Sequence, residues 1–125
     1  MAFRTYTVAE ARALLPELIE LSRELVILRA DTTELAEAIR QGEPSPLGGP
    51  AEYKAGEARV HEIMEWIVGR GLEPKGIAPL LVDFHAEIGG ELVLLCWLEG
   101  EEELAWYHRP EHGFSGRRPI PASWQ

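Results

Sequence analysis

The stretch that decides the fold is LLVDFHAEIGGELVLLCWL, residues 80–98. Over residues 80–88 every second residue is apolar, which is the period of a β-strand with one buried face. Gly89 and Gly90 follow, and two glycines in succession are typical of a tight hairpin turn because both can take a positive φ. Residues 92–98 are continuously apolar, as in a central strand that is buried on both faces. The sequence therefore predicts an antiparallel β-hairpin.

The two-residue turn also predicts which residues of the hairpin face each other. If Ile88 lies opposite Glu91, the same register sets Phe84 opposite Leu95, Val82 opposite Trp97, and Asp83 opposite Cys96. A second turn near Gly100 returns the chain as a third strand over 104–108. We therefore expect a three-stranded antiparallel meander over residues 79–109.

The length of the second turn decides which face the side chains of the third strand take. A loop of two or four residues sets Leu95 opposite Trp106 and Val93 opposite His108, so that the tryptophans and Phe84 share the core face. A three-residue loop with a bulge shifts this strand by one residue and moves every side chain to the other face. In that second register, His108 joins the face that carries Asp83, His85 and Cys96.

Two helices are predicted ahead of the meander. Thr7 and Glu10 have the spacing of a capping box, so a first helix is expected over 7–41. Pro16 lies inside this segment and predicts a kink rather than an end. The linker over 42–50 holds three prolines and three glycines, and helical spacing returns over 51–71.

The expected fold is a single α+β domain over 1–125, with the helices segregated ahead of the sheet. It consists of a long N-terminal antiparallel helical hairpin, the three-stranded meander and an irregular tail over 110–125.

The first helix is long for a domain of this size. At about 1.5 Å per residue it spans about 50 Å, against a diameter of about 28 Å for a compact domain of this length. Its leucines recur with the 3.5-residue period of a coiled coil, and leucines that protrude into water are unfavourable. We therefore expect a homodimer in which two hairpins form a four-helix bundle. The expected interface residues are Leu18, Leu21, Leu25, Leu28 and Leu35.

Composition narrows the classes of function. Lys and Arg total 12 against 21 Asp and Glu, which gives a formal net charge of −9 at pH 7. The field of such a chain repels nucleic acid and anionic membrane surfaces, so neither is an expected partner. Cys96 is the single cysteine and cannot form an internal disulfide, and no basic and then apolar leader opens the chain. The expected location is the cytoplasm.

The histidines near the meander raise the question of a metal site. In the shifted register, His85, His108 and Asp83, with His112 from the tail, offer the imidazole and carboxylate ligands that a borderline divalent ion takes. Their spacing matches no compact metal motif, so we expect hydrogen-bonded sheet histidines and no metal, with a divalent ion as the alternative cofactor. Cys96 lies among leucines in mid-strand, where a thiol is normally buried with a raised pKa.

The tail EHGFSGRRP, residues 111–119, brings positive charge to an acidic chain. Adjacent Arg117 and Arg118, together with His108, are able to bind a carboxylate or a phosphate, which predicts a small anionic ligand. The alternative is that these arginines pair with the acidic second turn and fasten the tail to the sheet. The acidic residues there are Glu99 and Glu101 to Glu103.

Several longer stretches resemble a known family. These are FRTYTVAEARALLPEL at 3–18, LVDF at 81–84, LCW at 95–97, GE at 100–101, WYH at 106–108 and GFSGRRP at 113–119. They resemble the prokaryotic family called domain of unknown function 2203, and the resemblance covers nearly the whole chain. It implies a small cytoplasmic protein with no assigned activity. It also implies that a site shared with relatives centres on Asp83, Glu101, His108 and Arg117, with His85 and His112 outside the motif.

Two hypotheses about function follow. The favoured one is a cytoplasmic, homodimeric, non-catalytic module whose sheet and tail bind a protein partner or a small anion. The alternative is a metal-dependent or acid–base enzyme in which His108 carries the proton, with Asp83, Glu101 and Arg117 beside it. An enzyme requires these side chains in an open cleft, whereas a structural network is packed shut.

Overall fold

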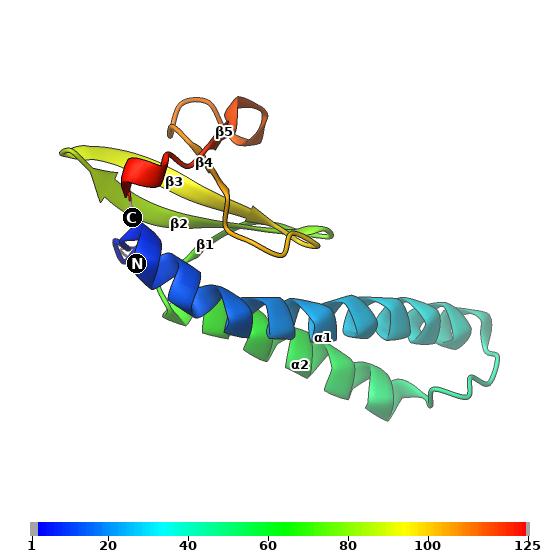
Figure 1. The fold of residues 1–125 in the computed structure, drawn as a ribbon. Helices are drawn as coiled ribbons and strands as arrows, with labels where there is room; N and C mark the ends of the chain where they lie inside the picture. Colours follow the sequence, from blue (N-terminus) through cyan, green and yellow to red (C-terminus); the bar gives the residue numbers. More distant parts are fainter. Residues whose placement is uncertain (1–2, 125) are drawn as a thin grey trace. The chain divides into compact units, whose positions relative to one another are not determined.

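The computed structural model describes residues 3–124 and contains two helices followed by a five-stranded sheet (Figure 1). The chain forms two compact units, one of residues up to Ile19 and from Ile67 onward, and one of Glu20–Trp66. The α+β class is confirmed, and the expected three strands are corrected to five. The elements are α1 (Val8–Gln41), α2 (Pro50–Gly69), β1 (Glu73–Ile77), β2 (Leu80–Ile88), β3 (Glu91–Leu98), β4 (Trp106–His108), η1 (Phe114–Gly116), β5 (Arg118–Pro119) and η2 (Ala122–Trp124).

The sheet is antiparallel and follows the order of the chain, β1-β2-β3-β4-β5. The predicted hairpin register is confirmed, because Phe84 pairs with Leu95 and Asp83 pairs with Cys96. Gly89 and Gly90 have φ values of 60° and 84°. A tight turn between two twisted strands needs positive φ at these positions, which glycine takes without steric cost.

The third strand takes the shifted register. Leu95 pairs with Tyr107 and Leu94 pairs with His108, whereas a short loop would have set Leu95 opposite Trp106. The connection over 99–105 holds seven residues, an odd number, so each side chain of β4 lies on the face opposite to that of the short-loop register. Trp106 therefore leaves the core face, and Tyr107 replaces it there.

Two short edge strands were missing from the prediction. β1 contains Pro74 and Gly76, and the pairing with β2 is irregular between them. Proline and glycine normally argue against a strand, but both are tolerated at a sheet edge. β5 has only two residues and pairs with β4, so its sequence carries no period to recognise.

One face of the sheet forms the core of its unit. Val82, Phe84, Leu95 and Trp97 lie on this face and are fully buried, and the ring of Tyr6 meets the Phe84 ring edge-on with 5.5 Å between centroids. The first turns of α1 contribute Val8, Ala11, Leu15 and Leu18 to the same buried set. The other face of the sheet is the one that carries Asp83 and Cys96.

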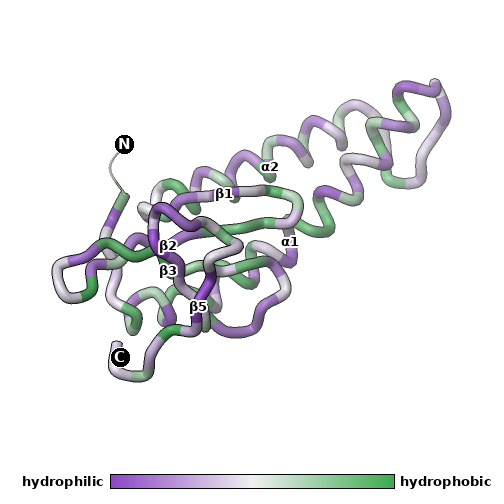
Figure 2. Tube along the Cα trace, turned by 90° about the horizontal axis from the view of Figure 1, so that it is seen from above, coloured by the Kyte–Doolittle hydropathy of each residue, from purple (hydrophilic) through white to green (hydrophobic). Residues whose placement is uncertain are grey.

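The predicted start of α1 is confirmed by its hydrogen bonds. The Thr7 backbone N–H donates to the Glu10 carboxylate at 2.9 Å, and the Glu10 N–H donates to the Thr7 hydroxyl at 3.0 Å, which is a reciprocal capping box. The helix continues through Pro16 to Gln41. Hydrophilic and hydrophobic residues alternate along both helices (Figure 2). No helix of the described chain has the length and apolar character needed to cross a membrane.

Within the unit of residues 20–66, α1 and α2 are linked by contacts of specific side chains. Arg59 of α2 donates from Nη2 to the Glu24 carboxylate at 2.8 Å, and Gly56 lies against Thr32. Leu25 and Leu35 of the expected dimer interface are buried here within a single chain, as Leu18 is in the other unit, so these three are corrected to intrachain core. Leu21 and Leu28 are half-buried, and a dimer through them stays a prediction.

The contact between Gly56 and Thr32 gives a stability prediction. Glycine to alanine inside a helix normally stabilises by about 1 kcal/mol. Here a Cβ at position 56 would lie 2.6 Å from the Thr32 Cγ2, so Gly56→Ala should destabilise the protein by about 1 kcal/mol in urea unfolding. Thr32→Ser removes that methyl group and keeps the hydroxyl that donates to the Leu28 carbonyl, so it should restore stability to the Gly56→Ala protein.

The matched control is Gly69→Ala at the end of α2, where a Cβ would meet no atom within 4 Å. This variant should be as stable as the parent or more so. Equal stability of the Gly56→Ala and Gly69→Ala proteins would show that the two helices do not approach each other as closely as described.

Candidate functional site

A row of chemically reactive side chains crosses the second face of the sheet. The cross-strand pairs Glu73 with Asp83, Asp83 with Cys96, and Cys96 with Trp106 place these four residues side by side on four strands. Because paired residues in a sheet share a face, His108 also lies on this side, opposite Leu94. The shifted register of β4 is what brings His108 to this face.

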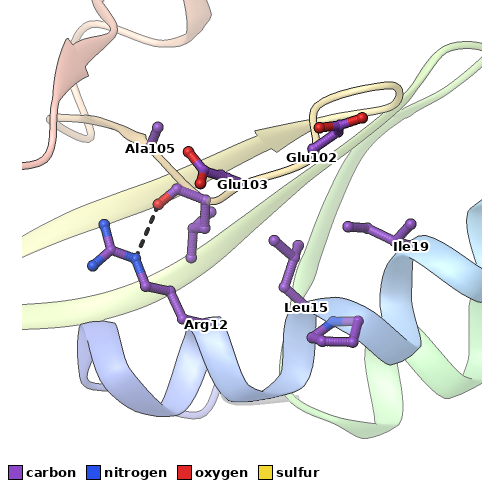
Figure 3. A pocket seen from close by; sticks show the side chains of 8 residues that line it. Arg12, Leu15, Ile19, Glu102, Glu103 and Ala105 are labelled. Carbon is purple, nitrogen blue, oxygen red and sulfur yellow. Dashed lines mark hydrogen bonds between the residues drawn. The ribbon is translucent and has the colours of Figure 1, made fainter.

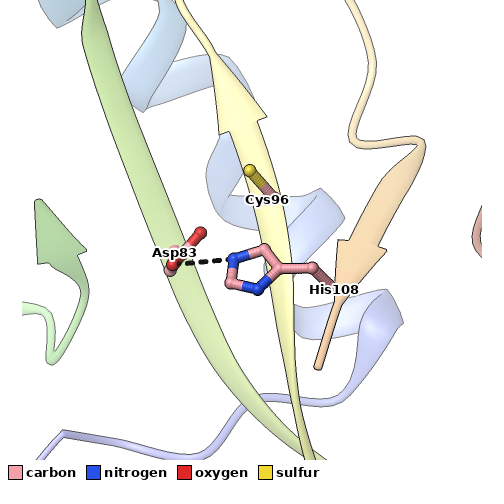
Figure 4. Close-up of side chains that lie close together, drawn as sticks. All are labelled: Asp83, Cys96 and His108. Carbon is pink, nitrogen blue, oxygen red and sulfur yellow. Dashed lines mark hydrogen bonds and ion pairs between the residues drawn. The ribbon is translucent and has the colours of Figure 1, made fainter. Parts of the chain in front are cut away.

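Asp83, Cys96 and His108 form a compact buried cluster. The three side chains reach toward one another from β2, β3 and β4 (Figure 4), and one ligand atom from each lies within 4.8 Å of the other two. The residues are 1%, 1% and 3% exposed, respectively. The Asp83 Oδ2 to His108 Nε2 distance is 3.1 Å, which is a hydrogen bond between two buried ionisable groups.

The second ring nitrogen of His108 determines which protons the pair can hold. Nδ1 lies 2.9 Å from the Arg109 backbone carbonyl, which can only accept, so Nδ1 carries a hydrogen. A neutral ring then has a bare lone pair on Nε2, and an ionised Asp83 has no hydrogen to offer it. The contact therefore requires one proton between Nε2 and Oδ2, or another cation in its place.

Burial dominates the electrostatics of the cluster. It raises the pKa of Asp83, and the neighbouring His108 offsets this shift in part. Burial, with the Asp83 carboxylate as a second cause, raises the pKa of the Cys96 thiol to about 12. Asp83 Oδ1 is buried without a hydrogen bond of normal geometry from the described residues, and the Cys96 thiol is only a weak donor to this carboxylate. An unpaired buried carboxylate oxygen is costly, so this atom points to a cationic partner.

A second pair, Arg117 and Glu101, lies against the backbone of this cluster. Arg117 Nη2 donates to the Glu101 carboxylate at 2.7 Å and to the Cys96 backbone carbonyl at 3.1 Å. Its guanidinium carbon lies 5.1 Å from the centroid of the Trp106 ring and 4.7 Å from that of the Phe114 ring. Arg117 thereby fastens the tail to the sheet, as the alternative interpretation predicted for both arginines, whereas Arg118 pairs along the strand with Tyr107.

The residues of this arrangement lie within the match to a known protein family. The family model DUF2203, described as an uncharacterized conserved protein, matches residues 4–120. The chain belongs to the DUF2203 family. No curated protein and no solved structure matches it. The match spans β2, β3, β4 and the tail as far as Ile120, and therefore both the Asp83 cluster and the Arg117 pair of this DUF2203 protein.

Two of the predicted metal ligands lie outside the cluster. His85 shares the face of Asp83, but its Nε2 lies 2.8 Å from the Glu73 carboxylate and its ring stacks on Phe3 at 4.5 Å. His112 is exposed in the tail beside Gly116. The cluster is completed instead by Cys96, which the sequence prediction passed over. Its signal was present, because the hairpin register already set Cys96 opposite Asp83.

The predicted anion clamp of Arg117, Arg118 and His108 is not formed in the DUF2203 protein. Successive residues of an extended segment point to opposite faces, and Arg118 pairs with Tyr107 on the other side from His108. Arg117 is engaged by Glu101, and His108 is buried against Asp83. The predicted site of Asp83, His108, Glu101 and Arg117 thus divides into two adjoining pairs, which meet at Cys96.

The Arg117 pair gives the prediction for this face. Glu101→Ala removes the acceptor of the Arg117 guanidinium and of the Leu98 backbone N–H, which donates at 2.8 Å. We expect it to lower the free energy of unfolding by about 2 kcal/mol, since the Arg117 guanidinium and the Leu98 N–H both lose a hydrogen-bond acceptor. Glu102→Ala alters an exposed neighbour and should change stability by no more than about 0.5 kcal/mol. Equal effects of the two variants in thermal melts would contradict this role of Glu101.

Proposed function

We propose that this DUF2203 protein binds one divalent transition-metal ion of the zinc class through Asp83, Cys96 and His108. The observation that carries the proposal is the mutual approach of a carboxylate, a thiol and an imidazole, all within 4.8 Å and all buried. Borderline ions such as Zn²⁺ take this mixture of oxygen, sulfur and nitrogen ligands. The proposal replaces the expectation that no metal is bound.

The distances suit such an ion after a small contraction. With bonds of about 2.0 Å to nitrogen and oxygen and about 2.3 Å to sulfur, ligand atoms in a tetrahedral site lie roughly 3.3 to 3.6 Å apart. The Asp83 to His108 distance of 3.1 Å is already close to this range. The thiol lies no more than 4.8 Å from either partner, so its sulfur would have to move closer by at most about 1.3 Å.

Hydrogen bonding around the cluster is also arranged for a cation. A histidine that binds a metal commonly donates its other ring N–H to a backbone carbonyl, as His108 Nδ1 does to Arg109. Its Nε2 lone pair then points at the ion. Asp83, His108 and Cys96 would hold the ion, which would supply the positive charge that the buried carboxylate needs in place of the shared proton. Loss of the Cys96 proton on binding supplies a thiolate ligand.

Burial favours a structural role of the ion over a catalytic one. The side chains of His108 and Asp83 are 4% and 1% exposed, whereas a general acid or base has to reach a substrate. An ion at this point connects β2, β3 and β4 and stabilises the sheet by its binding free energy. The proposal is therefore a non-catalytic, metal-binding module, and the acid–base enzyme is the less favoured alternative.

The first experiment is the metal content of protein purified without chelator or metal-affinity tag. We expect about one zinc-class ion per chain, and a melting temperature that falls when a chelator removes it. Co²⁺ added to the metal-free protein should produce the near-ultraviolet absorption of a cobalt–thiolate bond. That absorption should vanish in the Cys96→Ala variant.

The variants are chosen to separate metal binding from folding. Asp83→Asn keeps the shape, and its amide N–H₂ can donate to the bare Nε2 of His108, so the metal-free protein should stay folded while binding is lost. His112→Ala, which alters an exposed histidine, should leave the metal content unchanged. A metal-free parent that also fails to bind Co²⁺, or an Asp83→Asn protein with full metal content, would overturn the proposal.

A further inference from the structure

A groove separate from the metal cluster lies between the start of α1 and the connection from β3 to β4 (Figure 3). It has a volume of about 490 Å³, within the range of ligand-binding cavities. Leu15 and Leu104 are almost fully buried and form part of its floor, and Ile19 is partly exposed beside them. Pro16 and Ala105 complete an apolar lining that solvent can reach.

Two carboxylates border this apolar lining. Glu102 and Glu103 are exposed, and within residues 3–124 neither has an ion-pair or hydrogen-bond partner. Arg12, the cation of the lining, extends from α1 and donates from Nε to the Leu104 backbone carbonyl at 3.2 Å, whereas the two glutamates extend from the connection between β3 and β4 (Figure 3). The border therefore offers negative charge to an incoming group.

Hydrogen bonds fix the backbone of the turn that carries the two glutamates. The Trp97 indole N–H donates to the Glu101 backbone carbonyl at 2.9 Å, and the Glu101 N–H donates to the Leu98 carbonyl at 3.0 Å. Leu104, directly after Glu103, is 1% exposed. A carboxylate pair fixed at both ends loses little conformational freedom when a ligand binds.

We propose that this groove binds a basic and apolar peptide segment of a partner protein. Leucine-like side chains of the segment fill the apolar lining, and its lysine or arginine side chains pair with Glu102 and Glu103. Charge complementarity selects this occupant, because the two exposed carboxylates at the border favour a segment that carries lysine or arginine. The groove shares no residue with the Asp83 cluster, so this proposal stands apart from the metal site.

The test uses a fluorescently labelled peptide of alternating lysine and leucine, with binding followed by anisotropy on the full chain. A lysine and serine peptide of the same charge shows what charge alone contributes. We expect the leucine peptide to bind at least about tenfold more tightly than the serine peptide. Ile19→Ser should weaken binding of the leucine peptide and leave binding of the serine peptide unchanged.

The deciding variants reverse charge in two places. Glu102→Lys with Glu103→Lys should weaken the leucine peptide by about tenfold or more, because the pairing charges become repulsive. Glu34→Lys with Glu37→Lys makes the same change in net charge on exposed positions of α1 and should alter binding by less than about twofold. The proposal fails if both double variants lose binding equally, if the two peptides bind alike, or if the leucine peptide does not bind.

Discussion

The turn between β3 and β4 holds one conformation through Glu101, and the rest of the polar face depends on it. The Glu101 backbone N–H donates to the Leu98 carbonyl, and the Glu101 carboxylate accepts from the Leu98 N–H. The Glu101 carbonyl accepts from the Trp97 indole N–H. The odd number of residues in this connection turns His108 toward Asp83. The same carboxylate then binds Arg117 and so fastens the tail beside the cluster. One turn thus sets the register of a strand, the position of the tail and the meeting of three ligand atoms.

A carboxylate as deeply buried as Asp83 requires a reason, because removing its charge from water is costly unless a partner compensates. A shared proton with His108 compensates one oxygen, and the carboxylate has only the weak thiol donor of Cys96 beside it. An ion held by Asp83, His108 and Cys96 would use the lone pair that the Arg109 carbonyl leaves on Nε2 and would place a positive charge beside the carboxylate. A metal ion would therefore account with one ligand for the buried carboxylate, the free lone pair on His108 and the position of the Cys96 thiol beside them.

Local patterns in the sequence were sufficient for much of the fold. The alternation over residues 80–88, the Gly89-Gly90 turn and the Thr7 capping box each depend on neighbours in the chain, and each was predicted correctly. The register of β4 was not decided, because it depends on how a long turn is held by tertiary contacts. β1 was missed because proline and glycine obscure its period, and β5 was missed because it is too short to show one. Part of the site could be predicted from local sequence, because the Gly89-Gly90 turn sets Asp83 opposite Cys96. The position of His108 could not, because it depends on the register of β4.

The most direct test of the metal-binding account is X-ray absorption at the zinc edge of the zinc-loaded protein. The account predicts one sulfur neighbour at about 2.3 Å, from Cys96, together with nitrogen and oxygen neighbours at about 2.0 to 2.1 Å. Only one cysteine exists in the chain, so a sulfur neighbour identifies the site unless methionine supplies it, and the Cys96→Ala protein removes that ambiguity. A coordination shell of nitrogen and oxygen alone would contradict the account.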